Sequence, residues 1–465
     1  MNQDMKKPNI IFILSDQHRF CDVGYAGNTQ VDTPHLDALA ADGAYFNSAY
    51  SNCPLCVPAR GTLLTGLHAL NHGAAANDMP IIETTPSIAQ VLNQAGYSTA
   101  YIGKWHLGGV PRDQFITEER RLGFSYWNGC NCNHDYLNAY YDDHDNVRHQ
   151  IAGYEPIGQT DLALDYLDSQ QDNEAPAALW LCFGTPHDPY LLQPEDDLEY
   201  YFDQNLTLRS NVDQVNMKDP VENKPDAAAS YAGYYGHIRQ LDRQIGRIVD
   251  WLKTHGEYEN TIIVYTSDHG DMLFSHGYLN KQLYFDESAR VPFILSWPGH
   301  VPSGQRTQLI SLVDAAPTLL GLLDLRFEGE VDGHDVSPAL LNPRAKGQES
   351  VYFYSYVPCH QAAHRAIGSW RAVTDGKFMY AADQNNQPVC LYNLEQDPQQ
   401  LQDIKDDEAA RQDKVRLAAL LNHQVSLYDG CVPWEKLLKQ RGLSDVWEAS
   451  EHYFSGLWPT LVQPE

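Results

Sequence analysis

Short apolar runs alternate with helical patterns along about the first 345 residues. Runs rich in β-branched and aromatic residues at Ile10–Leu14, Ser98–Ile102, Ala177–Phe183 and Thr261–Thr266 each predict a buried strand. Apolar residues recur at helical spacing between Ile238 and Leu252 and predict a long amphipathic helix. Because such alternation is typical of a parallel sheet, we expect residues 1–345 to form one large α/β domain. Another strand is expected at Val291–Ser296, and helices over residues 34–42, capped by Thr33 and closed by Gly43, and 87–95, ended by Gly96.

The pattern changes after residue 345. Four short strands are expected, joined in part by hairpin signals at Asp375-Gly376 and Asn385-Asn386, and a polar helix follows over about Glu408–Leu427. Residues 346–465 therefore read as a small C-terminal α+β subdomain with an antiparallel sheet. The expected strands are Val351–Tyr356, Arg371–Thr374, Phe378–Ala381 and Cys390–Tyr392.

A third stretch, Leu122–Gln159, is rich in Tyr, Asn and Asp and has no clear period. We expect it to form long loops over the functional site, because binding residues concentrate on such loops.

Composition narrows the class of protein. The 465 residues carry a formal net charge of −29, so binding to nucleic acid through a broad basic surface is not expected. No apolar run approaches the roughly 18 residues that a membrane span needs, and the start of the chain has no signal-peptide pattern. We expect a cytoplasmic protein if Met1 is the native start, and a periplasmic or secreted one if a leader was trimmed. Nothing in the sequence indicates the oligomeric state.

Reactive side chains follow the ends of four expected strands. Asp16-Gln17 follow the first, Lys104 and His106 the second, His187 the third, and Asp268-His269 the fourth. In open α/β sheets the ligand crevice lies at the carboxyl ends of the strands, so these groups are expected to converge there. Two carboxylates with carbonyl and imidazole ligands favour Ca²⁺, with Mg²⁺ or Mn²⁺ as alternatives, whereas a zinc site with thiolates is disfavoured.

The segment from Cys56 to Gly66 is the most informative. Pro58 suits a first helical turn, so Cys56 is expected just before a helix N-terminus, where free N–H groups favour anions, with Arg60 one turn along. Two other interpretations stay open: Cys53 and Cys56 could form a redox dithiol, or Cys56 could be an inert buried thiol.

Cys56-x-Pro58-x-Arg60, followed by Gly61 and Thr65-Gly66, resembles the signature of type I sulfatases of the alkaline phosphatase superfamily. In that family the cysteine is oxidised to Cα-formylglycine, whose hydrate is the nucleophile. The resemblance implies an alkaline-phosphatase-like α/β/α sandwich around a large, mostly parallel sheet, plus a small C-terminal subdomain with a four-stranded antiparallel sheet. It extends over nearly the whole chain through ordered landmarks: residues 9–16, Thr33-Pro34-His35-Leu36-Asp37, 96–108, Pro186-His187, Asp268-His269-Gly270, Lys281, 313–318 and 365–380.

The resemblance also implies roles for single residues. Asp16, Gln17, Asp268 and His269 match metal ligands, with the formylglycine made from Cys56 as another. Arg60 and Lys104 match the groups that hold the formylglycine oxygens, and His106 matches the imidazole beside its hydrate, which we expect to act as a base. His187 and Lys281 match the pair that grips the sulfate and protonates the leaving oxygen. A formylglycine-generating maturation enzyme is an implied partner.

Two positions depart from the common family pattern. Gln17 stands where many members have Asp, and His269 where many have Asn. Asp16-Gln17 with Asp268-His269 also resembles phosphonate monoester hydrolases, so a phosphonate monoester or phosphodiester hydrolase is the alternative; Lys104 and His106 look like the sulfatase pattern. A non-catalytic binder of sulfated ligands that keeps Cys56 unmodified is a further alternative.

The expected substrate is a small sulfated saccharide. A net charge of −29 repels a polyanion, and Tyr, Asn and Asp in the 122–159 loops suit a sugar. We therefore expect an exo-acting enzyme that takes one terminal sulfated residue into a closed pocket. Candidate sugar contacts are His134, Asp135, His360, His364 and Arg365, whereas Cys130 and Cys132 are expected to pack in a loop rather than bind metal.

Overall fold

The computed structural model describes residues 6–219 and 226–461, and its centre is a ten-stranded sheet. The strands lie in the order β10-β2-β9-β8-β1-β7-β3-β4-β5-β6, and the central set β8-β1-β7-β3-β4 is parallel. β9 runs antiparallel to both of its neighbours, so the sheet is mixed but mostly parallel, as expected. The strands are β1 (Asn9–Asp16), β2 (Ala44–Tyr50), β3 (Ser98–Lys104), β4 (Tyr126–Cys130), β5 (Tyr140–Asp142), β6 (Arg148–Gln150), β7 (Ala177–Pro186), β8 (Thr261–Ser267), β9 (Phe293–Ser296) and β10 (Gly304–Ser311).

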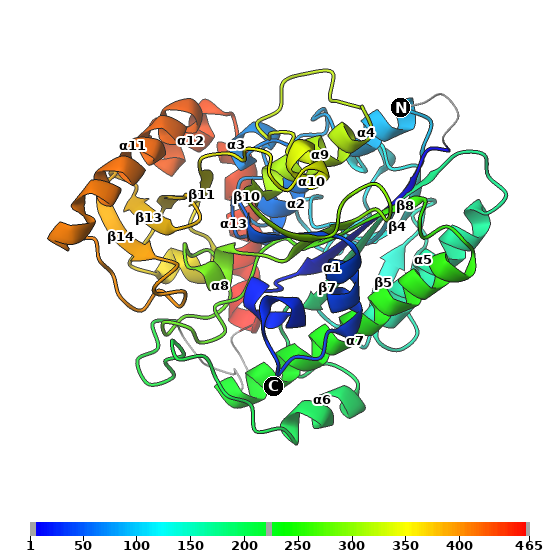
Figure 1. Ribbon diagram of the computed structural model, residues 1–465, viewed down its shortest axis with the longest axis horizontal. Helices are drawn as coiled ribbons and strands as arrows, with labels where there is room; N and C mark the ends of the chain where they lie inside the picture. Colours follow the sequence, from blue (N-terminus) through cyan, green and yellow to red (C-terminus); the bar gives the residue numbers. More distant parts are fainter. Residues whose placement is uncertain (1–5, 220–225, 462–465) are drawn as a thin grey trace.

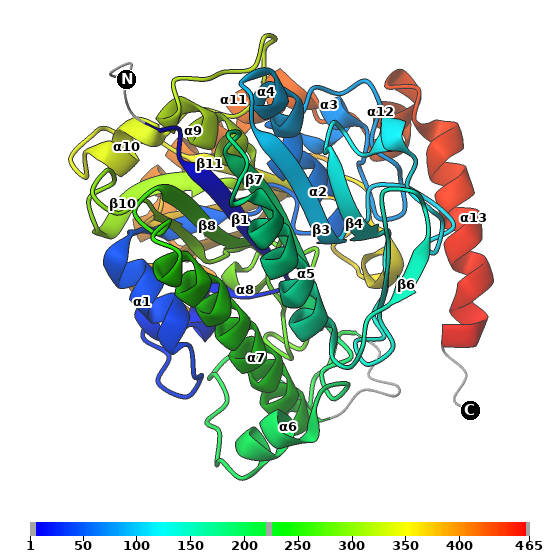
Figure 2. The same cartoon turned by 90° about the vertical axis from the view of Figure 1, so that its right-hand side faces the viewer.

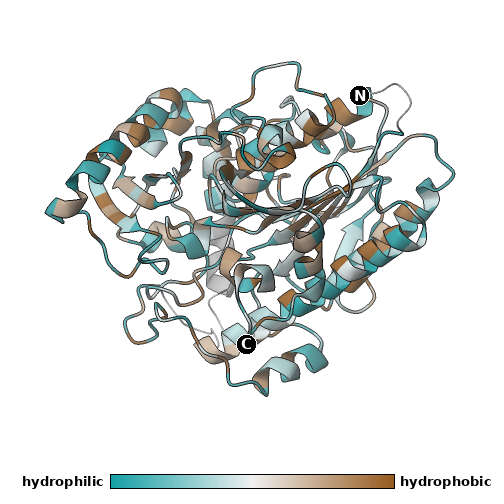
Figure 3. Cartoon of the chain, viewed as in Figure 1, coloured by the Kyte–Doolittle hydropathy of each residue, from teal (hydrophilic) through white to brown (hydrophobic). Residues whose placement is uncertain are grey.

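Helices cover both faces of this sheet (Figures 1 and 2). On one face α1 (Pro34–Asp42), α5 (Glu155–Gln170) and α7 (Ala227–Thr254) bury apolar side chains against alternate strand residues such as Ile11 and Ile13. On the other face α2 (Cys56–Thr65), α4 (Ile88–Gln94), α9 (Ala315–Leu322) and α10 (Ser337–Leu341) pack on Ile10, Phe12 and Leu14. Figure 3 shows the brown, apolar strands between the helix layers, so the α/β/α sandwich is confirmed.

A second sheet lies beside the first. Its four antiparallel strands lie in the order β11-β12-β13-β14 and belong to the C-terminal α+β part of the chain. The expected hairpins at 375–376 and 385–386 join β12 to β13 and β13 to β14. All strands of the large sheet come from residues 9–311 and all strands of the small one from residues 351–393, so the boundary at residue 345 falls between them and stays a prediction. The elements are β11 (Val351–Ser355), β12 (Trp370–Thr374), β13 (Phe378–Asp383), β14 (Pro388–Asn393), α11 (Arg411–Tyr428), α12 (Trp434–Gln440) and α13 (Ser444–Leu461).

The expectation of long loops over residues 122–159 is wrong in part. β4 extends the central sheet, β5 and β6 add an antiparallel edge, and α5 begins at Glu155. β4 is short and mostly buried, and β5 and β6 have three residues each, which is too short for a period to show in the sequence. The remaining helices are α3 (Ala69–His72), α6 (Glu195–Phe202) and α8 (Asp286–Ala289).

Two expected helix ends also differ in detail. Thr33 precedes α1, but its hydroxyl accepts a hydrogen bond from Gly24 N rather than from the helix. Ser87, expected inside the second helix, instead caps α4 with a full capping box, and the C-cap is Ala95 rather than Gly96. Among residues 6–219 and 226–461 there is no helix with the length and apolar character to cross a membrane.

Candidate active site

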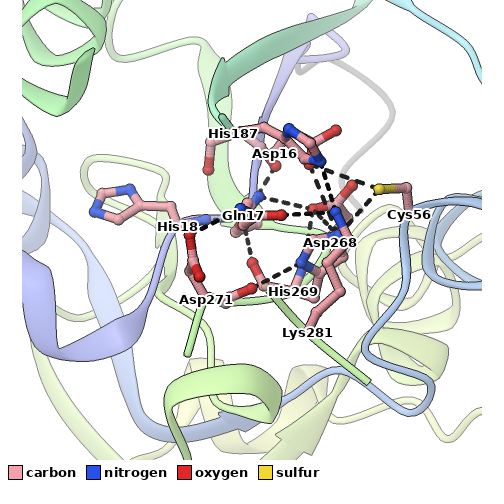
Figure 4. Close-up of polar contacts among 12 residues, drawn as sticks. Asp16, Gln17, His18, Cys56, His187, Asp268, His269, Asp271 and Lys281 are labelled. Carbon is pink, nitrogen blue, oxygen red and sulfur yellow. Dashed lines mark hydrogen bonds and ion pairs between the residues drawn. The ribbon is translucent and has the colours of Figure 1, made fainter. Parts of the chain in front are cut away.

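Cys56 is the first residue of α2, so the helix begins one residue earlier than expected, and the thiol faces the ends of β1 and β8 (Figure 4). Its Sγ lies 3.2 Å from His269 Nε2 and 3.8 Å from Asp16 Oδ1, and the residue is 1% exposed. Burial opposes ionisation, but Lys281, Lys104 and His269 together hold the pKa of Cys56 well below its ordinary value. Cys56 is therefore an activated thiol at a helix N-terminus.

No disulfide joins Cys53 and Cys56 in this structure, so the redox-dithiol interpretation has no support from a bond between them. All nine cysteines are free, and burial raises the pKa of the neighbouring Cys53 well above its ordinary value. The two thiols therefore lie in opposite electrostatic environments, and only that of Cys56 favours a thiolate.

Four buried donors gather where β1 and β8 end side by side. Ser15 pairs with Ser267 in the parallel register, which brings Asp16 and Asp268 together. One donor atom from each of Asp16, Cys56, Asp268 and His269 lies within 4.8 Å of the others. His269 Nδ1 donates to the Gly270 carbonyl at 2.9 Å, which directs Nε2 at the cluster. Two carboxylate oxygens with one imidazole fit a divalent cation.

Gln17 lies beside this cluster with its amide fixed from both ends. Its Nε2 donates to Asp271 Oδ2 at 2.8 Å, and its Oε1 accepts from Lys281 Nζ at 2.6 Å. Its φ of 73° is in the left-handed region, at a cost of about 1–3 kcal/mol. This fixed orientation directs the amide oxygen toward Lys281 (Figure 4). An amide oxygen is also the atom of this side chain that a hard cation prefers.

Arg60 and Lys104 supply positive charge beneath the cluster. Arg60 donates to Asp16 Oδ2 at 3.0 Å, to Asp268 Oδ2 at 3.1 Å and to the Lys104 carbonyl at 2.7 Å. Lys104 Nζ lies 2.6 Å from Asp16 Oδ2. Gly103 permits this placement, because at its φ of 102° a Cβ would lie 2.1 Å from the Cys182 carbonyl oxygen.

Lys281 and His187 form a contact on the more open side of the site. Lys281 Nζ donates to His187 Nε2 at 2.6 Å, and His187 Nδ1 donates to the Asp188 carbonyl at 2.7 Å. The ring of His134 stacks on that of His187, with centroids 4.2 Å apart and planes 22° apart. The structure thus brings His134, a predicted sugar contact, next to the predicted acid.

His106 lies beside Cys56 in a strained backbone conformation, with φ of 58°. Neither ring nitrogen has a hydrogen-bond partner among the described residues, and the Asp78 carboxylate is 3.6 Å from Nε2. Burial alone would lower the pKa of His106, but Cys132, Asp78 and Cys56 raise it to about 10. In the unmodified chain, where Cys56 is one of these anionic neighbours, the protonated ring is favoured. The role of His106 as a base after conversion of Cys56 stays a prediction.

The other predicted sugar contacts divide into three groups. Asp135 is exposed and caps its own turn by accepting from Asn138 N at 3.1 Å. Arg365 donates to both carboxylate oxygens of Asp219 and to the Lys281 carbonyl, so it holds the Lys281 segment in place. His360 and His364 line a pocket next to the cluster.

Sequence reasoning missed several groups that the fold places here. Asp78 is buried and paired with Arg112, and Asp271 holds Gln17. Burial raises the pKa of Glu155 to about 8, and for Cys132 the cations His106 and Lys104 outweigh burial and lower its pKa to about 6. Only Asp271 could have been found from the sequence, because it lies two residues after His269. The other residues lie on segments without a periodic pattern of apolar residues.

The comparison with family models shows the family to which the chain belongs. Residues 8–325 match the sulfatase model, and residues 275–426 match the model described as N-sulphoglucosamine sulphohydrolase, C-terminal. The chain belongs to the sulfatase family. It is therefore a sulfuric ester hydrolase, a class that generally uses a metal ion and a formylglycine.

Two curated sulfatases are similar over most of their length. The ulvan-active sulfatase of Formosa agariphila is 34% identical over 399 residues, 85% of this chain and 76% of that protein. The N-acetylglucosamine-6-O-sulfatase of Bacteroides thetaiotaomicron is 25% identical over 510 residues, covering 93% and 89% of the two chains.

Solved structures share the whole architecture of this sulfatase. One, from work on the metabolism of multiple glycosaminoglycans by Bacteroides thetaiotaomicron, has a TM-score of 0.81 and 26% identity and covers 94% of this chain and 99% of its own. The phosphonate monoester hydrolase of Agrobacterium radiobacter has a TM-score of 0.71 at 22% identity, covering 92% and 96%, and this likeness extends to the fold alone.

Proposed function

We propose that this sulfatase removes a sulfate ester from the end of a short carbohydrate, with Cys56, converted to formylglycine by a maturation enzyme, at the reaction centre. The observation that carries this proposal is the group of Asp16, Cys56, Asp268 and His269, buried together at the N-terminus of α2. With a divalent cation bound, the aldehyde hydrate at position 56 supplies the attacking oxygen and the cation supplies polarising charge.

Ca²⁺ is the cation we propose, with Mg²⁺ or Mn²⁺ as alternatives. Asp16 and Asp268 would supply carboxylate oxygens, and Gln17 an amide oxygen, and such hard donors suit Ca²⁺ and Mg²⁺. His269 Nε2, which in its neutral form would offer a lone pair to the cluster, is the donor that admits Mn²⁺.

The cationic residues surround the place where charge develops. Arg60 and Lys104, which pair with Asp16 and Asp268 beside Cys56, are the cations that we propose hold the oxygens of the converted residue. Lys281 and His187 bind the sulfate oxygens from the open side. Such fixed charges are worth most in a buried site, where water cannot screen them.

The proton for the leaving alcohol comes from the Lys281–His187 pair. In the resting arrangement Lys281 donates to His187 Nε2, so the transferable proton is on Lys281 and lies 2.6 Å from the imidazole. Either group can pass that proton to the departing oxygen, which then leaves as a neutral alcohol. His106, beside Cys56, is proposed to accept the second proton needed to release sulfate.

A carbohydrate is supported by what similar proteins act on. One relative is described as ulvan-active and another as acting on an N-acetylglucosamine 6-O-sulfate, and both are matched over most of this chain. The test is a desulfation screen over sulfated mono- and oligosaccharides and small aryl and choline sulfates. Turnover restricted to aryl or choline esters would contradict the carbohydrate.

The rival chemistry is phosphonate or phosphate ester hydrolysis on the same scaffold. We expect kcat/KM to be higher for sulfate esters, because Lys104 and His106 lie around Cys56 as the sulfatase pattern requires. Purified enzyme is assayed with matched sulfate, phosphonate and phosphodiester substrates. A preference of tenfold or more for the phosphonate, about 1.4 kcal/mol of transition-state binding, would reverse this assignment.

Exo action is tested by substrate size and salt. The net charge of −29 should slow encounter with a sulfated polymer in dilute buffer, and salt should relieve that repulsion, since the Debye length falls from about 8 Å at physiological salt to about 3 Å at 1 M. We expect a sulfated disaccharide to be cleaved faster than its parent polymer at low salt. Equal rates along the intact polymer would contradict exo action.

A further inference from the structure

A pocket of about 320 Å³ lies beside the catalytic centre and has no role in the steps above. Its walls come from three parts of the chain: residues 77–78, residues 358–364 after β11, and residues 447–455 of α13. The volume is at the lower end of the roughly 300–1,000 Å³ typical of ligand pockets. It therefore suits one sugar ring better than a longer segment of polymer.

Three contacts tie this pocket to the reacting groups. Asn77 Oδ1 accepts from the backbone N of Val57, the residue after Cys56, at 3.1 Å. Asp78 lies 3.6 Å from His106. Gln282, the residue after Lys281, donates to the Cys359 carbonyl at 2.9 Å.

These contacts place the pocket next to both the nucleophile and the sulfate-binding Lys281. A group that remains attached to the sulfate until the ester bond breaks must lie within reach of both. The pocket is thus placed to hold the leaving alcohol.

The outer wall is α13, which lies beyond residues 8–325 and 275–426, the parts matched by the family models. It crosses from the C-terminal subdomain to the catalytic domain, and it runs along the flank of the molecule in Figure 2. Ser450 Oγ donates to the Asp78 carbonyl at 2.7 Å, and Arg112 N donates to Tyr453 Oη at 3.3 Å. This helix therefore closes the pocket with an element outside the residues that either family model matches.

The lining has the chemistry of an uncharged sugar site. Trp447 and Ala363 offer apolar surface for the C–H face of a ring, and Asn77 offers a polar atom for hydroxyls. Neither Lys nor Arg is among the described residues that line it. Its carboxylates are Asp78 and Glu451, and its imidazoles are His360, whose pKa burial lowers, and His364.

The negative charge of the Asp78 carboxylate is already balanced by neighbouring residues. Its two oxygens accept from Arg112 at 2.8 Å each, and His360 Nε2 lies 3.5 Å away. Glu451 is exposed on α13 at the rim. An anionic leaving group would thus meet the Glu451 carboxylate with no Lys or Arg among the described lining residues to offset it.

We propose that this pocket binds the leaving alcohol as a single uncharged sugar ring against Trp447, and that Glu451 disfavours uronates and doubly sulfated sugars. The inference rests on the proposed carbohydrate sulfatase function and names its substrate class. It makes α13 the element that sets substrate choice, while the buried centre carries the chemistry.

The experiment compares neutral and anionic leaving sugars. Galactose and galacturonic acid, each sulfated at position 2, 3 or 4, are assayed with the metal-loaded, converted enzyme, and 4-nitrophenyl sulfate reports the catalytic centre. We expect kcat/KM at the cleaved position to be at least about tenfold higher for the neutral sugar. Equal or reversed values would overturn the inference.

Two charge-reversal variants isolate the contact. Glu451→Lys should lower the neutral-to-uronate ratio of kcat/KM three- to tenfold. Glu448→Lys changes net charge equally on an exposed position of the same helix that does not line the pocket, so it should leave the ratio unchanged. The same shift in both variants would show a general charge effect and overturn the role of Glu451.

The aromatic contact is tested with Trp447→Ala. We expect the ratio of kcat/KM for the saccharide to that for 4-nitrophenyl sulfate to fall, mainly through KM, and inhibition by the desulfated neutral sugar to weaken. If the variant does not fold, Trp447→Phe should reduce the same ratio less, and the Glu451 comparison stands without it. Saccharide turnover that neither Trp447 nor Glu451 affects overturns this inference alone, whereas no saccharide turnover by the unaltered enzyme overturns the proposed function as well.

Discussion

The catalytic centre and the pocket beside it lie within a few contacts of each other but are held in different ways. In the centre, Arg60 is bonded to three partners, and Asp16 and Asp268 are fully buried at the ends of adjacent strands. In the pocket, α13 is joined to the catalytic domain by single contacts such as Ser450 to Asp78, and Glu451 is exposed. Rigid, paired charges suit a chemistry shared by a family, and a lightly attached wall suits a substrate that differs between members.

This difference predicts that substitutions in the centre abolish turnover of every substrate. Asp16→Asn and Asp268→Asn should each reduce kcat by about 10³-fold or more and lower the bound metal, because each removes a charged oxygen and one of the two carboxylate partners of Arg60. Sulfate release and metal content are measured together. Asp172→Asn, exposed before the opposite end of β7, is the control. Full activity in either variant, or in metal-stripped enzyme, would contradict a metal-assisted centre.

The open side of the centre should give a smaller loss. Lys281→Ala or His187→Ala should lower kcat by about 10²–10³-fold while the cation stays bound, since these residues hold sulfate and the proton rather than the metal. Single-turnover assays on both sugar and aryl sulfates provide the measurement, with the exposed Lys377→Ala as the matched control. A loss confined to KM would assign the pair to ground-state binding only.

The buried charges of the centre also cost stability. Burial raises the pKa of Glu155 to about 8, so the folded state holds its proton more tightly than the unfolded state. Stability from this group is complete below its unfolded pKa and is lost as pH rises through about 8. Glu155→Gln keeps the acceptor for Gln159 and should be more stable than the parent by about 1–3 kcal/mol above pH 8. Unfolding followed from pH 5 to 9 measures this, and a difference independent of pH would contradict it.

The smallest effect is expected between the two regions, at His134. Its ring stacks on His187, and aromatic pairs contribute about 0.5–1.5 kcal/mol beyond their buried area. His134→Ala should therefore lower kcat by roughly two- to tenfold, and His134→Phe, which keeps the stack, should restore most of it. If kcat of His134→Phe is as low as that of His134→Ala, the stack is not the cause. The imidazole nitrogen atoms, which contact Cys132 and Tyr136, would then be responsible.

The two regions also differ in how far the sequence predicts them. The strands that carry Asp16, Lys104, His187 and Asp268 are long apolar runs, and the parallel register brings their ends together without further information. The place of Gln17 beside the cluster follows from its position at the end of β1. Its hydrogen bond to Asp271 accompanies a positive φ that no sequence pattern indicates.

The pocket could not be predicted in the same way. Its walls join residues near positions 77, 360 and 450, and α13 was not expected at all. Asp78 is important because it is buried next to His106 and Arg112, which a single sequence does not show. Contacts between distant loops can be seen only in the folded chain, whereas the meeting of strand ends can be predicted from the sheet topology alone.

The most direct test of the central claim measures conversion of Cys56 and sulfate release in the same samples. Co-expression with different amounts of a maturation enzyme gives a series in which the peptide containing Cys56 loses about 18 Da as formylglycine forms. We predict that the rate of sulfate release rises in proportion to the converted fraction and extrapolates to zero without conversion, as in Cys56→Ala. Full sulfate release from a chain whose Cys56 is entirely unmodified would contradict the account.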